Sequence, residues 1–342
     1  MQTRLDAFFS HFVTFCGENG ICMYQSERKK GMAVKMNEFF PEGVLLNTTA
    51  NRRRTGTASA LAEAAMEGQV VEARAVLCDS DHNLHVELPC MQGVIPREEG
   101  AVGIAEGTTR DIALISRVSK PVSFLVTGFD FTEDGRRRAV CSRRAAQEKC
   151  RREYIEERRP GDVVEARVTR LESFGAFCDI GCGIPALLPI ASMSVSRIAH
   201  PADRLCVGMD IYAVITSIED NRICLSQREL LGTWEENAAL FEQGETVAGV
   251  VRSVEDYGIF VELTPNLAGL AEPRPGVRVG QHAGVYIKNI LAEKMKLKLV
   301  LIDSEDCHEL PPPLKYFITE GHIDRWVYSP PHCGKVIETI FE

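Results

Sequence analysis

Residues 162–180 read DVVEARVTRLESFGAFCDI, and this stretch decides the fold of the chain. From Val164 to Thr169 apolar and polar residues alternate, which is the period of a strand with one buried face. The run FGAF at 174–177 then combines a glycine-assisted reversal with the start of a second apolar stretch. We therefore predict two strands joined by a tight turn.

The two phenylalanines of this run, Phe174 and Phe177, have two interpretations. On a flat strand, residues three apart point to opposite faces, so one ring would lie in the core and the other on the surface. Gly175 permits a bulge or a positive φ that would bring both rings to one face, where unpaired bases could stack on them. Strand geometry alone leaves both interpretations open.

The beginning of the stretch recurs along the chain. GDVVEAR at 161–167 is nearly repeated as GQVVEAR at 68–74, and it resembles GETVAGV at 244–250. Three copies of one pattern predict three structural units of the same kind.

The aromatic pair recurs as well. The second and third copies stay in register without a gap, so FGAF at 174–177 aligns with YGIF at 257–260. Core packing does not readily explain two independent aromatic pairs at one repeat position. The repetition therefore favours the interpretation in which both rings of each pair share one exposed face.

Each unit continues with a glycine and a short apolar strand, and then with a longer strand. The short strands are expected at 93–96, 183–189 and 269–272, the longer ones at 211–218 and 285–291, and a last strand of the second unit at 222–226. Five short strands in roughly 70 residues, with glycine-rich turns, predict a small closed barrel of the OB type. The predicted fold class is all-β, with tandem five-stranded OB-fold barrels joined by short helical linkers.

The pattern also predicts how the chain divides. The expected parts are a poorly defined N-terminal extension (1–66), a diverged barrel (67–145), a basic helical linker (146–159), a second barrel (160–229), a second helical linker (230–243), a shortened barrel (244–303) and a C-terminal tail (304–342). Residues 136–159 hold ten basic and four acidic residues, so this stretch either tracks phosphates or forms a solvated linker helix.

Length and composition fit a soluble protein of two or three domains, since 342 residues are 45% apolar and 25% charged. No apolar run approaches the roughly 18 to 20 residues that span a membrane, and the N-terminus lacks a secretory signal pattern. We expect a cytoplasmic protein without membrane contact. The net charge of −9 argues against a surface that is basic throughout, and it leaves room for a local basic face.

The twelve cysteines include no Cys-x-x-Cys pair, which favours free thiols in a reducing compartment. The tail holds five residues of the two types that most often bind zinc: Cys307, His308, His322, His332 and Cys333. Their spacing matches no familiar zinc finger. We therefore expect no metal and no other cofactor.

These motifs resemble a known family. The aromatic pairs and the ending DNRICLS at 220–226 make residues 160–229 similar to the RNA-binding domain repeated in bacterial ribosomal protein S1. Residues 244–303 resemble a shortened copy, and residues 67–145 resemble a diverged one. The whole arrangement is similar to the short S1-like homologues of clostridial bacteria. The resemblance implies OB-fold barrels that bind RNA.

The resemblance also implies which residues form the RNA face: two surface aromatics, a residue of the third strand, and an acidic and a basic residue near the last strands. These positions are Phe174, Phe177, Asp220 and Arg222 in the second unit, and Tyr257 and Phe260 in the third. The third-strand position is Pro189 in the second unit and Glu272 in the third, where a carboxylate would repel phosphate.

Further basic residues complete the predicted set. Lys294, Lys296 and Lys298 alternate along one expected strand and would restore positive charge in the third unit. Arg167 and Arg252 are candidates on the first strands of the second and third units. The aromatic positions of the first unit fall among His82, Leu84 and His85. We therefore expect weak RNA binding by the first unit and two competent faces.

The predicted function is the binding of single-stranded mRNA in translation, with the small ribosomal subunit as a further partner. One alternative is an RNA chaperone or RNA-turnover cofactor that acts without the ribosome, and another is a protein-interaction scaffold with reduced RNA binding. An enzyme is not expected. The sequence has no phosphate-cradling glycine-rich loop, no paired histidine metal motif and no nucleophile in a recognisable context, and no small-molecule substrate is expected.

Overall fold

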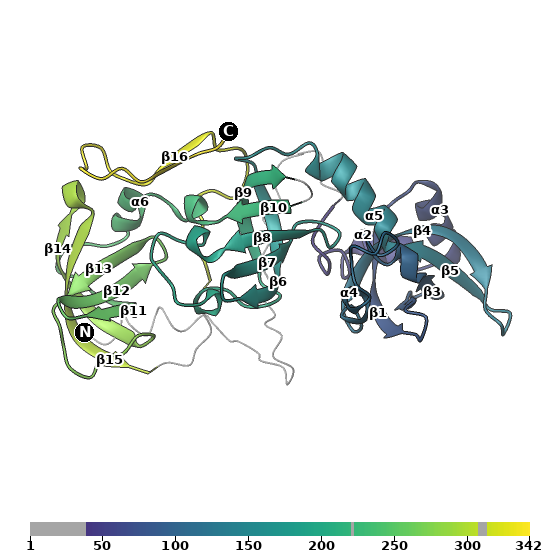
Figure 1. The fold of residues 1–342 in the computed structure, drawn as a ribbon, viewed down its shortest axis with the longest axis horizontal. Coiled ribbons are helices and arrows are strands. Elements are labelled where there is room, and N and C mark those ends of the chain that lie inside the picture. The colour runs from purple at the N-terminus through teal and green to yellow at the C-terminus, as the bar shows by residue number, and fades with distance from the viewer. Residues whose placement is uncertain (1–38, 220–221, 307–312) are drawn as a thin grey trace.

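The chain forms three closed five-stranded barrels that follow one another along the long axis of the molecule (Figure 1). This computed structural model describes residues 39–219, 222–306 and 313–342. The three barrels confirm the predicted all-β class with tandem OB-fold units. Among the helices in these ranges, none has the length and apolar character needed to cross a membrane.

The three barrels share one strand order. Barrel 1 consists of β1 (Val71–Cys78), β2 (Leu84–Glu87), β3 (Gln92–Ile95), β4 (Pro121–Phe131) and β5 (Arg137–Ser142). Barrel 2 consists of β6 (Val163–Glu172), β7 (Gly175–Asp179), β8 (Pro185–Pro189), β9 (Asp210–Glu219) and β10 (Arg222–Ser226). Barrel 3 consists of β11 (Thr246–Glu255), β12 (Gly258–Thr264), β13 (Leu267–Ala271), β14 (His282–Leu291) and β15 (Lys296–Glu305). In each barrel the third strand pairs in parallel with the fifth, which closes the sheet.

The alternation of apolar and polar residues on β6 determines which of its side chains enter the core of barrel 2. Val164, Ala166 and Val168 on β6 are each at most 2% exposed and pack inside the barrel. Glu165 and Thr169, between and beyond them, point to solvent. The predicted pair of strands around a turn at 173–174 is confirmed by β6 and β7.

Helices are few and short. They are α2 (Thr49–Thr55), α3 (Ala58–Met66), α4 (Ile112–Ile115), α5 (Arg143–Cys150) and α6 (Trp234–Ala238), with 3-10 turns at Arg97–Glu99, Ile190–Ser192, Pro201–Asp203, Arg228–Leu231 and Ala292–Lys294. The hydroxyl of Ser142 caps α5 by accepting a hydrogen bond from the Ala145 N–H at 2.8 Å. The helical path continues as a π-helical turn only to Ile155, because the chain then turns toward β6. The expected helix to Arg159 is therefore too long.

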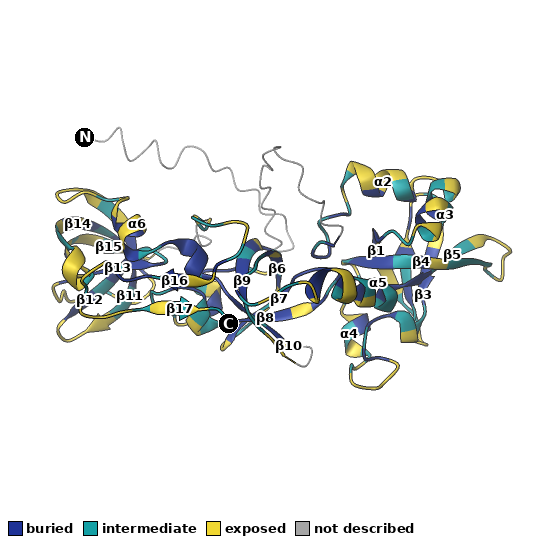
Figure 2. Ribbon diagram, turned by 90° about the horizontal axis from the view of Figure 1, so that it is seen from above, coloured by how far each residue is buried: buried dark blue, intermediate teal, exposed yellow. Residues whose placement is uncertain are grey.

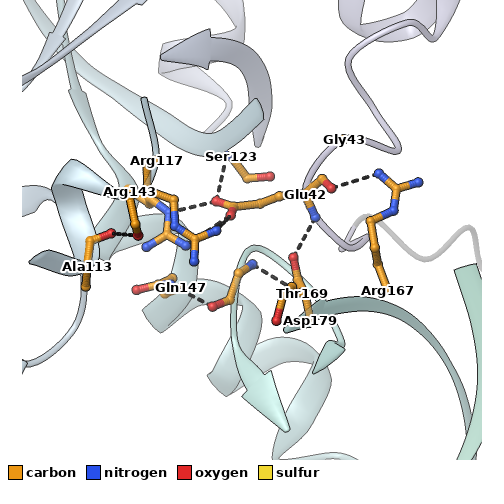
Figure 3. A network of polar contacts seen from close by, with 12 residues as sticks. Glu42, Gly43, Ala113, Arg117, Ser123, Arg143, Gln147, Arg167, Thr169 and Asp179 are labelled. Carbon is orange, nitrogen blue, oxygen red and sulfur yellow. Dashed lines mark hydrogen bonds and ion pairs between the residues drawn. The ribbon is translucent and has the colours of Figure 1, made fainter. Parts of the chain in front are cut away.

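A turn ahead of barrel 1 inserts the carboxylate of Glu42 between the first two barrels (Figure 3). Arg143 donates to it from Nε at 2.7 Å and from Nη2 at 3.1 Å, and Arg117 donates from Nη1 at 3.0 Å. The backbone N–H of Ser123 on β4 adds a hydrogen bond of 3.1 Å. The side chains of Glu42 and Arg143 are each only 4% exposed. The buried charge is thus compensated on all sides by residues of barrel 1 and of α5.

The backbone of the same turn contacts barrel 2. The N–H of Glu42 donates to Asp179 Oδ2 at 2.7 Å, and Arg167 Nη1 donates to the Glu42 carbonyl oxygen at 2.9 Å. Burial, together with the nearby charge of Glu42, raises the pKa of Asp179 to about 6. One residue therefore bonds to both barrels, and its contacts limit how the barrels move against each other.

A second buried ion pair joins barrels 2 and 3. Arg204, just after a 3-10 turn between β8 and β9, donates to both carboxylate oxygens of Glu262 on β12 at 3.2 and 2.8 Å. Arg252 on β11 donates to the same carboxylate at 3.1 and 3.0 Å. The side chain of Glu262 is 7% exposed, so this junction also depends on a buried carboxylate whose charge is compensated by arginines.

The segment 313–342 runs back along barrels 2 and 3 (Figure 1). Its two strands, β16 (Arg325–Val327) and β17 (Glu338–Ile340), pair with each other. The N–H of Val163 on β6 donates to the Gly321 carbonyl at 3.0 Å, and the Tyr328 hydroxyl donates to the carbonyl of Asn266 at 2.5 Å. The expected tail is thus packed against the second and third barrels. Similarly, residues 39–66 of the expected extension hold α2 and α3.

The buried carboxyl of Glu72 on β1 makes the stability of barrel 1 depend on pH. It accepts hydrogen bonds from the N–H groups of Gly43 at 2.6 Å and Leu46 at 2.5 Å, yet burial raises its pKa from 4.5 to about 7. The folded chain therefore binds a proton that the unfolded chain releases, and stability falls as pH rises from about 4.5 to 7 and is constant above. The shift corresponds to a loss of about 3 kcal/mol.

We predict that urea unfolding of the native chain shows this decline between pH 5 and 8. Glu72→Gln removes the titrating group, so the decline should shrink in this variant whatever its absolute stability. An unchanged pH profile in Glu72→Gln would mean that the Glu72 carboxyl keeps an ordinary pKa in the folded state.

Candidate nucleic-acid interface

The outer face of barrel 2 carries a row of side chains across four strands. Arg170 on β6 lies opposite Phe177 on β7, and Phe177 lies opposite Leu187 on β8. Leu187 pairs in turn with Cys224 on β10. All four side chains are at least partly exposed, while their neighbours along β7, β8 and β10 are buried. This row is the centre of the candidate interface.

The two rings predicted to share a face lie together. Phe174 occupies the turn before β7 and is 53% exposed, and its ring centroid is 6.1 Å from that of Phe177 with the planes at 89°. Phe174 precedes the strand, so strand alternation does not separate the two rings. This edge-to-face contact leaves aromatic surface open to solvent.

The expected role of Gly175 needs correction. Gly175 is not among the residues with positive φ, and the bulge lies in the facing strand, between Val168 and Arg170. A Cβ on Gly175 would lie 2.5 Å from the carbonyl oxygen of Leu188 on β8. Glycine is needed here because β7 and β8 approach closely beside the aromatic pair.

Cationic side chains flank the rings of barrel 2. The guanidinium carbon of Arg170 lies 4.6 Å from the centroid of the Phe177 ring, and Arg170 Nε lies 3.0 Å from a carboxylate oxygen of Glu172. Arg222 is exposed on β10, two residues before Cys224 and therefore on the same outer face. Arg170 was not predicted. The strand register could have identified Arg170, because the bulge before this residue places it opposite Phe177.

One predicted residue of the second unit, Arg167, is not available on this face. Arg167 is engaged at the junction with barrel 1, where it binds the carbonyl of Glu42 and donates to Asp210 at 2.7 and 2.9 Å. Its prediction as an RNA contact is therefore not supported by its position. Asp220 lies outside the described residues.

Barrel 3 repeats the arrangement. Tyr257 is 67% exposed, and its ring centroid is 6.2 Å from that of Phe260 with the planes at 86°. Phe260 pairs with Leu270 on β13, and Leu270 pairs with Lys298 on β15. Lys296 and Lys298 are exposed on the same side of β15. Four predicted residues of the third unit are thus brought to one face.

Two other expectations for the third unit change, and a third is kept. Lys294 lies in the 3-10 turn before β15, and Met295 adopts a left-handed conformation with φ 47°, so Lys294 does not continue the strand alternation. Arg252 is bound to Glu262 at the junction of barrels 2 and 3 and is largely buried. Glu272 is exposed just past the end of β13, so this carboxylate remains near the face.

Pro189, at the third-strand position of barrel 2, ends β8 opposite Gly175. A proline ring offers no charge and no hydrogen-bond donor. The third-strand contact implied by the resemblance is therefore absent from the described part of this face, and Arg170 supplies a cation from the other side of the ring instead.

In barrel 1 histidines occupy the place of the aromatic pair. His85 pairs with Leu77 on β1 and with Val94 on β3, as Phe177 does with Arg170 and Leu187. Its Nε2 lies 2.9 Å from Asp79 Oδ2. Hydrogen bonds from His85 and Asn83 lower the pKa of Asp79 to about 2 against the opposing effect of burial. A permanent carboxylate beside the ring disfavours phosphate at this place.

His82 lies three residues before His85, as Phe174 lies before Phe177. Its Nε2 is 4.0 Å from a carboxylate oxygen of Asp111. Leu84, the third residue among which the aromatic positions were expected, is buried in the core. Both histidines thus have an acidic neighbour.

In the helical part of the basic stretch 136–159, basic side chains bind other parts of the protein. Arg143 is buried against Glu42. Arg144 pairs with Glu99 at 2.7 Å, and Lys149 Nζ donates to a backbone carbonyl at 2.8 Å. These contacts favour neither a phosphate-tracking helix nor a solvated linker.

The candidate zinc ligands that the structure describes, His322, His332 and Cys333, do not form a metal-binding group. Within the three described ranges, no group of three or more His, Cys, Asp or Glu side chains could hold a metal ion. His322 instead bridges Asp162 at 2.7 Å and Asp324 at 3.2 Å. Cys307 and His308 lie outside the described residues.

Comparison with known proteins agrees with this geometry. The family model of the S1 RNA binding domain matches residues 157–228. The chain is S1-like. The matched residues contain the whole of barrel 2 with its aromatic pair, and the other two barrels repeat its strand order.

Relatives of this S1-like chain include ribosomal proteins. The small ribosomal subunit protein bS1 of Leuconostoc lactis is 34% identical over 155 residues, which cover 44% of this chain and 34% of that protein. The bS1 homolog of Bacillus subtilis (strain 168) is 30% identical over 200 residues, covering 56% and 50%. The bS1 protein of Staphylococcus aureus (strain COL) is 29% identical over 221 residues, covering 58% and 55%. The chain thus spans between about a third and a half of the length of these relatives.

The close approach at Gly175 predicts a local effect on stability. Gly175→Ala places a methyl group against the β8 backbone and should destabilise the chain by about 1–3 kcal/mol, measured by thermal unfolding. Gly128→Ala is the matched control, since Gly128 also lies in a strand, has an ordinary φ and has open space where its Cβ would be. Equal effects of the two substitutions would contradict the proposed packing role.

Proposed function

We propose that this S1-like chain binds single-stranded RNA, with mRNA in translation as its ligand, through the outer faces of barrels 2 and 3. The observation that carries the proposal is the repetition of one exposed aromatic pair. The ring centroids of Phe174 and Phe177 are 6.1 Å apart, and those of Tyr257 and Phe260 are 6.2 Å apart, at the same repeat position with nearly the same tilt.

Stacking supplies the base contacts. A base stacked on an aromatic ring contributes about 1–3 kcal/mol whatever its identity, so each face should accept many sequences. Single strands are favoured because the bases of a duplex hide their faces. Arg170 and Arg222 in barrel 2, and Lys296 and Lys298 in barrel 3, would attract phosphates in a salt-dependent way.

The two faces differ in where the positive charge lies. Barrel 2 has a cation on each side of its rings, Arg170 from β6 and Arg222 from β10. Barrel 3 has Ser253 opposite Phe260, so no cation lies there, and its exposed lysines lie on β15 (Lys296, Lys298) and on the neighbouring β14 (Lys288). We therefore expect barrel 2 to bind RNA more tightly than barrel 3. Because the barrels are joined by buried contacts, the second face meets a bound strand at high effective concentration.

The same proposal extends to partners and organisation. The relatives are proteins of the small ribosomal subunit, which supports the small subunit as a partner and the cytoplasm as the place of action. We divide the chain as barrels at 67–145, 160–229 and 244–303, joined by linkers at 146–159 and 230–243. Binding of this kind requires no catalytic group, no cofactor and no membrane, so the chain is proposed as a binding protein and not an enzyme.

We predict that Phe174→Ala lowers the affinity for an oligo(U) strand by about tenfold, because one stacking contact is lost. Fluorescence anisotropy at two salt concentrations measures the effect. Val207→Ala is the matched control, since Val207 belongs to the same barrel and is also 53% exposed. The two variants should unfold at similar temperatures. Equal affinities of Phe174→Ala and Val207→Ala would remove barrel 2 from the proposal, and the same comparison with Tyr257→Ala tests barrel 3.

We also predict that the tagged chain sediments with the small ribosomal subunit in a sucrose gradient at low salt. Washing with high salt should release it, since phosphate contacts weaken as salt rises. If the chain binds oligo(U) but stays at the top of the gradient at low salt, the ribosome-independent alternative is the better one. If it binds neither, the scaffold alternative gains support.

A further inference from the structure

The hairpin of β4 and β5 extends further past the strand pair that closes its barrel than the equivalent hairpins of barrels 2 and 3 do. Asp130 pairs with Arg138 in barrel 1 as Glu219 pairs with Arg222 in barrel 2, and Arg138 and Arg222 lie two residues before Val140 and Cys224, which pair with the third strand. Seven residues (131–137) lie between Asp130 and Arg138, compared with two (220–221) in barrel 2 and four (292–295) between the paired Leu291 and Lys296 of barrel 3. The extended hairpin projects from the end of the molecule, and its tip is exposed (Figure 2).

The extension has a fixed shape. The N–H of Thr132 donates to the carbonyl of Arg136 at 2.8 Å, and the N–H of Arg136 donates to the Thr132 hydroxyl at 3.1 Å. At its base Arg138 binds both carboxylate oxygens of Asp130, at 2.9 and 2.7 Å. These bonds close the turn and stiffen one face of the hairpin, so side chains on the other face are presented in a defined arrangement.

That other face combines aromatic rings with a cation. Phe131 lies opposite Arg137, and Phe129 lies opposite Ala139, so Phe129, Phe131 and Arg137 share one face. The guanidinium carbon of Arg137 is 4.3 Å from the centroid of the Phe129 ring. Phe131 is 70% exposed, compared with 53% for Phe174 in barrel 2. An exposed ring beside a stacked guanidinium offers both a base and a phosphate a contact.

The charge of the hairpin supports an anionic ligand near its strands. Among the residues that the structure describes, neither Arg136 nor Arg137 forms an ion pair, in contrast to Arg138. Glu133 and Asp134 occupy the turn itself and are exposed. A phosphate is therefore expected beside Arg137 on the strand and away from the tip.

From this geometry we infer that the β4–β5 hairpin of barrel 1 is a third contact site for single-stranded RNA, with a base on Phe131 and phosphates at Arg136 and Arg137. The inference rests on the proposed RNA binding of barrels 2 and 3, and it adds a site that the histidines of barrel 1 did not predict. The site replaces the aromatic pair of the other barrels, whose place in barrel 1 is taken by His82 and His85 beside carboxylates.

The test uses the full chain and two oligo(U) probes, one of about 30 nucleotides and one of about 6, because a single OB fold covers about 4–16 nucleotides. Phe131→Ala and the double variant Phe131→Ala, Arg137→Ala should lower the affinity for the long probe by about tenfold. They should leave the affinity for the short probe unchanged, since this probe occupies the face of barrel 2 and does not reach the hairpin. Met66→Ala, also in the N-terminal part and 82% exposed, is the control.

Four outcomes separate the possibilities. Loss of long-probe affinity in the hairpin variants, with rescue by Phe131→Trp, supports the site. If the native chain binds neither probe, the proposed function itself fails. If Phe174→Ala weakens binding while the hairpin variants match Met66→Ala, the function holds and the hairpin inference is overturned. If the hairpin variants keep full RNA affinity but no longer sediment with the small subunit, the hairpin binds protein, which also overturns the inference.

Discussion

The arrangement of the first two barrels depends on the carboxylate of Glu42. A buried carboxylate is costly to desolvate, and the cost is offset only while its partners keep their geometry. Those partners come from different elements: Arg143 from α5, Arg117 and the Ser123 N–H from barrel 1, and, through the Glu42 backbone, Asp179 from barrel 2. Movement of either barrel would break several of these bonds at once. The junction is therefore rigid because of a local charge network and owes little to linker length.

The junction of barrels 2 and 3 uses an acidic residue at the same repeat position as the junction of barrels 1 and 2. Asp179 and Glu262 each lie two residues after the second aromatic residue of their barrel, and each binds a group from the preceding unit. The equivalent residue of barrel 1 is Glu87, two residues after His85, and it is exposed. An acid at this strand position is buried only where a preceding barrel covers it. The aromatic face and the junction thus belong to one repeated design, with the acid two residues further along the strand than the second ring.

Much of the fold could be read from the sequence, because strand alternation and glycine turns are local properties. Repetition of FGAF as YGIF identified the aromatic pairs, which single-strand geometry could not decide. The charged residues were harder to predict. Arg170 depends on a bulge that changes register, and Arg167 is held by acceptors on distant parts of the chain. Lys294 leaves the face because of the left-handed turn at Met295. Partners that are far apart in sequence decide where a cation points, and no local pattern contains them.

The C-terminal segment 313–342, which runs back along barrels 2 and 3, affects the order in which the parts of the chain fold. The bond from Val163 to the Gly321 carbonyl, and the packing of Ile323 and Trp326 in the third core, join barrels 2 and 3 to a segment that comes later in the sequence than both. During synthesis the contact between barrels 1 and 2 has all its partners once β10 has been made, whereas the contacts of barrel 2 with this segment need residues 313–342 as well. We therefore expect the first two barrels to dock before the segment 313–342 packs against barrels 2 and 3.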